Sequence, residues 1–143
     1  MWDTEITTAD GASVRARDVV AGQSLLGVNC MNGETIAGRV KRVMEKETSG
    51  VYSIFAENGA VVNCSASHDL IEGFGDTIGK RAELFKEGDS LLVFDRPSQK
   101  IVEAKTTAIG YVEIYQPVLM FEMDTAEHTF VSGGIISHNR LKA

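Results

Sequence analysis

Hydrophobic residues in this chain stand in short, often β-branched stretches that Gly, Asn and Asp repeatedly interrupt. Stretches of this kind, bounded by turn residues, are typical of β-strands. The strands predicted in this way span residues 36–43, 51–55, 61–64, 91–94, 101–115, 118–123 and 128–131. Helical periodicity is weak, and we expect only short helical turns within residues 15–20 and 81–85. The pattern therefore predicts an all-β domain.

A comparison of the chain with itself reveals two similar segments. Residues 15–26 read RARDVVAGQSLL and residues 81–92 read RAELFKEGDSLL, so that Arg, Ala, Gly, Ser and two Leu coincide. In both segments a turn-rich stretch comes first and an apolar strand follows. We expect Gly22 and Gly88 to form the tight turn that enters this strand. The repeat predicts two related halves within a single β domain.

Length and charge narrow the classes of protein that the sequence can encode. The 143 residues are enough for one domain with a sizeable core, and the hydrophobic fraction of 43% is ordinary for a globular protein. A net charge of -6 disfavours nucleic acid as a partner, because nucleic-acid binding needs a positive surface. The sequence shows neither the ~18 consecutive apolar residues of a membrane span nor an N-terminal apolar signal segment. We therefore expect a cytoplasmic protein without a membrane partner.

Two cysteines, Cys30 and Cys64, are too few for a disulfide scaffold or a structural zinc site. Cys64 and His68 together would supply only two metal ligands, so we expect no metal and no cofactor. A nucleophilic thiol would need a lowered pKa, and the simpler expectation is that both cysteines are small apolar residues of the core.

Histidine exchanges protons near neutral pH more readily than other side chains, and the chain has three, His68, His128 and His138. The first closes the segment CSASH, which directly follows a predicted strand. The hydroxyl of Ser65 and the imidazole of His68 can lie on one side of this turn. There they would hold a peptide carbonyl or protonate a leaving amine. The alternative is a surface turn without a chemical role.

The pair His138-Asn139 near the end of the sequence suggests a second kind of chemistry. An Asn side chain can attack its own main-chain carbonyl, close a succinimide ring and cleave the bond that follows it. Its amide is a weak nucleophile and a peptide nitrogen is a poor leaving group, so the step needs a nearby acid and base. His138 can supply the acid or the base. His128 lies near it if a hairpin forms at Gly133-Gly134. The alternative is a polar chain end without chemistry.

Together, the repeat and the segments around the histidines resemble the Hedgehog/intein (Hint) domain family, and inteins in particular. The segments that carry the resemblance are DTEITTADG at 3–11, DVVAGQSLL at 18–26, SASH at 65–68, FEM at 121–123, HTFV at 128–131 and GIISHN at 134–139. They occur in the family's order and cover nearly the whole chain. SASH is similar to the family's Thr-x-x-His motif, with Ser65 in place of Thr. The resemblance implies an all-β Hint-fold horseshoe of two pseudo-two-fold related halves.

The resemblance also implies protein autoprocessing, which is a single-turnover cleavage or splicing of flanking peptide bonds rather than the work of a turnover enzyme. In the family, a Cys or Ser at the first position attacks the preceding carbonyl, assisted by the Thr-x-x-His pair, here Ser65 and His68. Cyclisation of the last Asn, here Asn139, then frees the domain with help from His128 and His138. The implied partners are covalently attached flanking segments of a bacterial or phage-encoded host protein, and the domain is expected to be monomeric. It would span residues 1–139, with residues 140–143 beginning the C-terminal flanking segment.

Three positions depart from the family pattern. Met1 cannot act as a nucleophile, so we expect the N-terminal step to be missing. Arg140 cannot accept an ester, which favours cleavage over splicing, as in bacterial intein-like domains. Met120 stands where the family often has an acidic residue, in a Tyr-Asp-x-Glu-x pattern. The alternative interpretation is a decayed or domesticated Hint domain that acts as a non-catalytic structural or interaction module.

Overall fold

The computed structural model describes residues 4–138, and nearly all regular structure in this range is β. Its strands are β1 (Glu5–Thr7), β2 (Ser13–Arg15), β3 (Ser24–Asn29), β4 (Glu34–Thr48), β5 (Val51–Ala56), β6 (Val61–Cys64), β7 (Asp69–Leu70), β8 (Lys80–Arg81), β9 (Ser90–Asp95), β10 (Lys100–Val112), β11 (Gln116–Met123), β12 (Thr129–Ser132) and β13 (Ile135–His138). Two short 3-10 helices, η1 (Ala16–Asp18) and η2 (Ala82–Leu84), lie within the two segments where helical turns were predicted. The prediction of an all-β fold is confirmed.

Most of the predicted strand boundaries differ from those in the structure. The largest difference is at the strand predicted over 36–43, which is β4 and continues to Thr48 because it pairs with β11 over that length. Two other boundaries are wrong for identifiable reasons. β10 ends at Val112 rather than at residue 115, because Val112 pairs with Val51 and its partner strand β5 extends no further. β12 begins at Thr129 rather than at His128. The backbone of His128 has a left-handed φ of 54°, which a strand does not accommodate.

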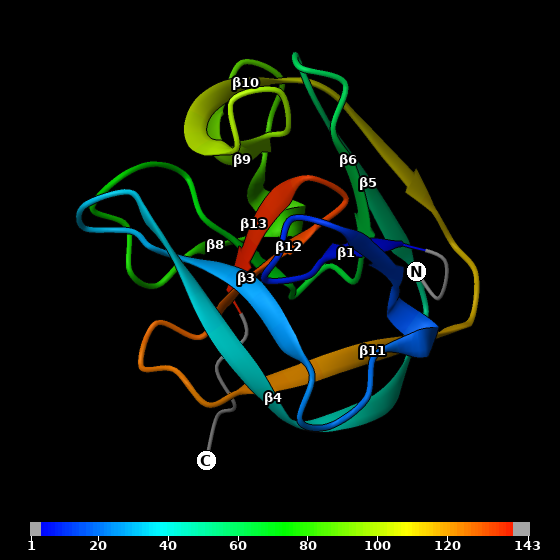
Figure 1. Cartoon of the computed structure of the whole chain (residues 1–143). Coiled ribbons are helices and arrows are strands. Elements are labelled where there is room, and N and C mark those ends of the chain that lie inside the picture. The colour runs from blue at the N-terminus through cyan, green and yellow to red at the C-terminus, as the bar shows by residue number, and fades with distance from the viewer. Residues whose placement is uncertain (1–3, 139–143) are drawn as a thin grey trace.

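The strands of residues 4–138 form two sheets in which all paired strands are antiparallel. The larger sheet has the order β2-β1-β12-β13-β9-β10-β5-β6, and the short strands β7 and β8 attach to it through β13. The smaller sheet has the order β11-β4-β3. β12 and β13 run through the middle of the molecule, with β4 and β11 along one side and β5 and β10 along another (Figure 1). The fold thus places the end of the described chain in the interior, where every residue of β13 is buried.

The two similar sequence segments form the same local structure. In the first, η1 leads through a turn into the β3–β4 hairpin, and in the second η2 leads through a turn into the β9–β10 hairpin. The turn glycines make matching hydrogen bonds: Gly22 donates its N–H to the carbonyl of Val40, and Gly88 donates to that of Thr106, each at 2.7 Å. Their φ angles of 88° and 93° are ones that other residues rarely adopt. The prediction of two related halves is confirmed.

A cluster of buried apolar side chains joins the two sheets. Ile6 of β1 and Phe130 of β12 belong to the larger sheet, and Phe121 of β11 belongs to the smaller one. The rings of Phe121 and Phe130 meet edge to face with centroids 5.4 Å apart. Because this contact brings β11 against β12, it also shapes the cleft described below.

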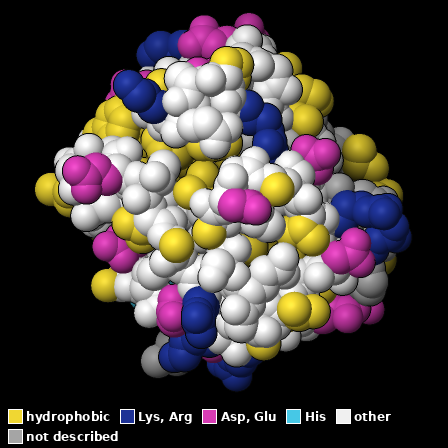
Figure 2. Space-filling view, in the orientation of Figure 1, with side chains coloured by type: hydrophobic (Ala, Val, Ile, Leu, Met, Phe, Trp, Pro, Cys, Tyr) yellow, Lys and Arg dark blue, Asp and Glu magenta, His cyan; other side chains and the backbone are white. Residues whose placement is uncertain are grey.

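The surface carries charges of both signs. On the face shown in Figure 2, acidic and basic side chains are interspersed among apolar and uncharged ones. In the described part of the chain, no helix has the length and apolar character needed to cross a membrane.

Candidate functional site

A cleft of about 340 Å³ lies where the ends of several distant segments meet. One wall is apolar and includes residues 118–121 of β11 together with Phe130 of β12. The polar side is formed by residues from five separate places in the sequence: Thr4, Lys46, Asn63, Ser65, Ser67, His68, Asp69, Ser132 and His138. The first and the last residues that the structure describes thus line one cleft, together with the predicted Ser65–His68 pair.

Ser65 and His68 lie in the turn that follows β6. The N–H of His68 donates to the carbonyl of Ser65 at 3.2 Å, which closes the turn, and the carbonyl of His68 accepts the N–H of Ala82 at 2.8 Å. Ser65 is buried, and the half-buried ring of His68 meets the ring of Phe130 edge-on at 6.4 Å. The structure therefore places this turn in the cleft rather than on the open surface.

The imidazole of His68 is held in its neutral form. Burial, together with the nearby Lys46 and His138, lowers its pKa to about 4. At neutral pH His68 can therefore donate one N–H or accept a proton, but it does not act as a charged acid.

His128 and His138 are brought together by the predicted hairpin. β12 pairs with β13 across Gly133-Gly134, so that Thr129 lies opposite His138. His128, which directly precedes β12, places its ring 6.1 Å from that of His138 in an edge-on arrangement. His138 is buried and lines the cleft, whereas His128 does not line it. Asn139, Met1 and Arg140 lie outside the described residues.

Six polar or charged residues of the cleft were not among the predicted site residues: Thr4, Lys46, Asn63, Ser67, Asp69 and Ser132. Asp69 follows His68 directly, and its adjacency to that residue was the only available signal in the sequence. Lys46 reaches the cleft because it lies opposite Val118 in the β4–β11 pair, and Ser132 reaches it from β12. Both positions depend on strand register, which the sequence alone does not provide. Met120, the residue that departs from the family pattern, also lines the cleft.

The two cysteines are buried and behave as core residues. Burial raises the pKa of Cys64 to about 12 and that of Cys30 to about 11, so both thiols stay protonated at neutral pH. Among residues 4–138, no group of three or more His, Cys, Asp or Glu side chains is arranged to hold a metal ion.

The two sheets, the related halves and the cleft where distant segments meet define a Hint-type fold. Solved inteins share it. The Ssp DnaB mini-intein variant M86 matches with a TM-score of 0.84 at 18% identity, over 99% of this chain and 94% of that chain. The DnaB intein from Synechocystis sp. PCC 6803 matches with a TM-score of 0.83 at 21% identity, over 98% and 96% of the two chains. The TvoVMA intein matches with a TM-score of 0.84 at 15% identity, over 97% of this chain and 96% of that chain.

Comparison at the level of sequence adds nothing to this result: no protein-family model matches the chain, and no curated protein does. The similarity to solved structures extends over almost the whole chain, so the fold is that of inteins throughout. The resemblance found in the sequence motifs is confirmed at the level of fold.

Proposed function

We propose that this domain processes the polypeptide in which it is embedded, by cleaving or splicing the peptide bonds that flank it. The supporting observation is the shared cleft, in which Thr4, close to one end of the chain, lies together with His68 and His138, which directly precedes Asn139. We further propose that the domain spans residues 1–139 and that residues 140–143 begin the C-terminal flanking segment. The flanking segments are then both substrate and partner.

The C-terminal step that we propose is cyclisation of Asn139. Its side-chain nitrogen attacks its own main-chain carbonyl carbon, and the bond to the nitrogen of Arg140 breaks. The attacking amide loses one proton and the departing nitrogen gains one, so the products are a C-terminal succinimide and a free amine. His138 directly precedes Asn139 and is buried at the cleft, where it donates the proton. His128, 6.1 Å from it, supports this role.

The N-terminal step that we propose uses Ser65 and His68. A Cys or Ser supplied before Trp2 would attack the preceding carbonyl and convert an amide into an ester or thioester. Neutral His68 is suited to exchange a proton with the departing nitrogen, and the hydroxyl of Ser65 is suited to hold the carbonyl oxygen. Cys64 is poorly suited to be the nucleophile, because burial raises its pKa to about 12 and keeps the thiol protonated.

Intact-mass measurement tests the C-terminal step. A protein with a stable unrelated domain fused after Ala143 should slowly lose everything after Asn139. The remaining fragment should have a mass one water below that of its hydrolysed form. Asn139→Ala removes the internal nucleophile and should abolish this loss, while His138→Ala should slow it. A fusion that stays intact over days would contradict the proposal and favour the non-catalytic module.

A second measurement tests the N-terminal step. Met1→Cys, in a protein with a fused domain before it, should undergo cleavage before residue 1 when a thiol such as dithiothreitol is added. His68→Ala in the same protein should prevent this cleavage, whereas Cys30→Ala serves as the control and should leave it unchanged. If the Met1→Cys fusion stays intact after the thiol is added, the cleft does not support this step.

A further inference from the structure

We propose that Asp69 is a positioning residue that orients the imidazole of His138 for the C-terminal step. The inference rests on the proposed function. Among residues 4–138, Asp69 is the one carboxylate that lines the cleft. It directly follows His68 and forms the two-residue strand β7 with Leu70.

Strand register places Asp69 beside His138. The two residues lie directly opposite each other where β7 pairs with β13. Side chains opposed in this way in an antiparallel pair point to the same face of the sheet, with their Cβ atoms about 5 Å apart. A carboxylate and an imidazole at this separation are within reach of a direct hydrogen bond.

Gly79 gives independent evidence for the same juxtaposition. A Cβ added to Gly79 would lie 2.9 Å from the Cβ of Asp69 and 3.5 Å from the Cβ of His138. The two side chains therefore leave the backbone at neighbouring points, and the missing side chain of Gly79 keeps the space beside them open. The φ of 89° at Gly79 also favours glycine at this position.

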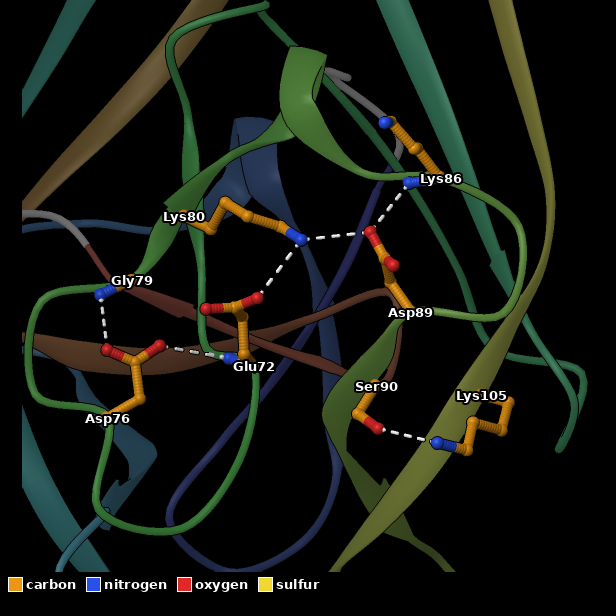
Figure 3. Close-up of polar contacts among 8 residues, drawn as sticks. All are labelled: Glu72, Asp76, Gly79, Lys80, Lys86, Asp89, Ser90 and Lys105. Carbon is orange, nitrogen blue, oxygen red and sulfur yellow. Dashed lines mark hydrogen bonds and ion pairs between the residues drawn. The ribbon is translucent and has the colours of Figure 1, made fainter.

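The loop between β7 and β8 that carries Gly79 is held in place by charged groups. The carboxylate of Asp76 accepts the N–H groups of Gly79 at 2.9 Å, Glu72 at 3.0 Å and Ile78 at 3.1 Å. The Nζ of Lys80 contacts Glu72 at 3.0 Å and Asp89 at 2.9 Å, so that the loop is tied to the start of β9 (Figure 3). A fixed loop keeps the space around Asp69 and His138 constant.

Arg81 lies opposite Asp69 on its other side but takes a different partner. Its guanidinium contacts Glu83 at 2.7 Å. The other charged or titratable groups near His138 are the rings of His128 and His68, together with Asp76 and Lys46. Asp69 is thus the carboxylate that the strand register sets directly against His138.

The expected role follows from this geometry. A carboxylate hydrogen-bonded to one ring nitrogen fixes the orientation of an imidazole and stabilises its protonated form. The other ring nitrogen of His138 then carries the proton that the proposed C-terminal step needs.

An NMR titration tests the pairing without requiring any cleavage. In the Asn139→Ala protein, Asp69→Asn should lower the titration midpoint of the His138 ring by about one pH unit, because it removes an adjacent negative charge. The matched control Asp95→Asn changes a carboxylate of β9 outside the cleft and should leave the midpoint unchanged. Asp69→Glu keeps the negative charge, so the titration midpoint of the His138 ring should stay close to its original value. Equal midpoints in the Asp69→Asn and Asp95→Asn proteins would overturn the proposal.

The cleavage rate gives the second readout. In a fusion with intact Asn139, Asp69→Asn should slow C-terminal cleavage about tenfold, the factor that corresponds to one pH unit of proton affinity. Asp69→Glu should recover part of the rate, and a urea unfolding curve for each variant identifies any loss of fold. A parent fusion that never cleaves overturns the proposed function and the role of Asp69 with it. A parent that cleaves as fast as its Asp69→Asn variant overturns the role of Asp69 alone.

Discussion

The lowered pKa of His68 makes the free energy of unfolding depend on pH. Burial in the cleft, with Lys46 and His138 nearby, lowers the pKa of His68 from 6.5 to about 4. The unfolded chain keeps the higher pKa, so between these two values the unfolded state binds the proton more readily. The contribution of neutral His68 to the free energy of unfolding is therefore fully present above pH 6.5. It is lost as the pH falls from 6.5 toward 4. Linkage gives a loss of about 2 kcal/mol between pH 7 and pH 5, and about 3 kcal/mol by pH 4.

Urea unfolding at a series of pH values measures this contribution. Other acidic groups also titrate in this range, so the informative quantity is the difference between the parent protein and His68→Gln. Between pH 7 and pH 5, the free energy of unfolding of the parent should fall by about 2 kcal/mol more than that of His68→Gln. Lys46→Met should raise the pKa of His68 back toward 6.5 and so make this loss smaller, because it removes one of the positive charges. Parallel stability curves for the parent and His68→Gln would refute a neutral His68 with a lowered pKa.

Three further predictions concern other positions in the fold. Thr129→Val should cost about 1–3 kcal/mol in urea unfolding, because the buried Thr129 hydroxyl accepts from the N–H of Val28 and donates to its carbonyl, both at 2.9 Å. Gly133→Ala should destabilise the protein much more than Gly88→Ala. A Cβ at position 133 would lie 1.9 Å from the carbonyl oxygen of Val61, whereas a Cβ at position 88 would have no neighbour within 4 Å. Equal urea unfolding midpoints for the two variants would contradict this. Cys64 should react with a thiol reagent at pH 8 only when urea unfolds the protein, because burial raises its pKa to about 12.

Features that depend on local sequence could be predicted. The hairpin at Gly133-Gly134 follows from two adjacent glycines between apolar β-branched runs, and both glycines have positive φ. The strand predicted at residues 61–64 has the same bounds in the structure as β6. The repeat was visible because it includes the turn glycines Gly22 and Gly88, whose backbone conformation restricts the choice of residue.

Features that depend on tertiary register could not be predicted. β7 and β8 have two residues each, too few for any alternating pattern. β7 forms a strand because it pairs with β13, and β8 because it pairs with β7. The position of Asp69 opposite His138 follows from that pairing. Lys46 is likewise an ordinary exposed residue of β4 until β11 pairs with it and makes it part of the cleft.

The relation between the two halves accounts for the location of the cleft. The carbonyl of Thr4 accepts the N–H of Ala16 at the start of η1, and the carbonyl of His68 accepts the N–H of Ala82 at the start of η2. Thr4 and His68 are therefore structural counterparts in the two halves, although they are far apart in the sequence. Counterparts of a two-fold arrangement approach each other only near the axis that relates them, and both residues line the cleft. A duplicated fold thus brings the beginning of its first half against the beginning of its second. β13, which pairs with β12, β7 and β9, adds His138 at the same place.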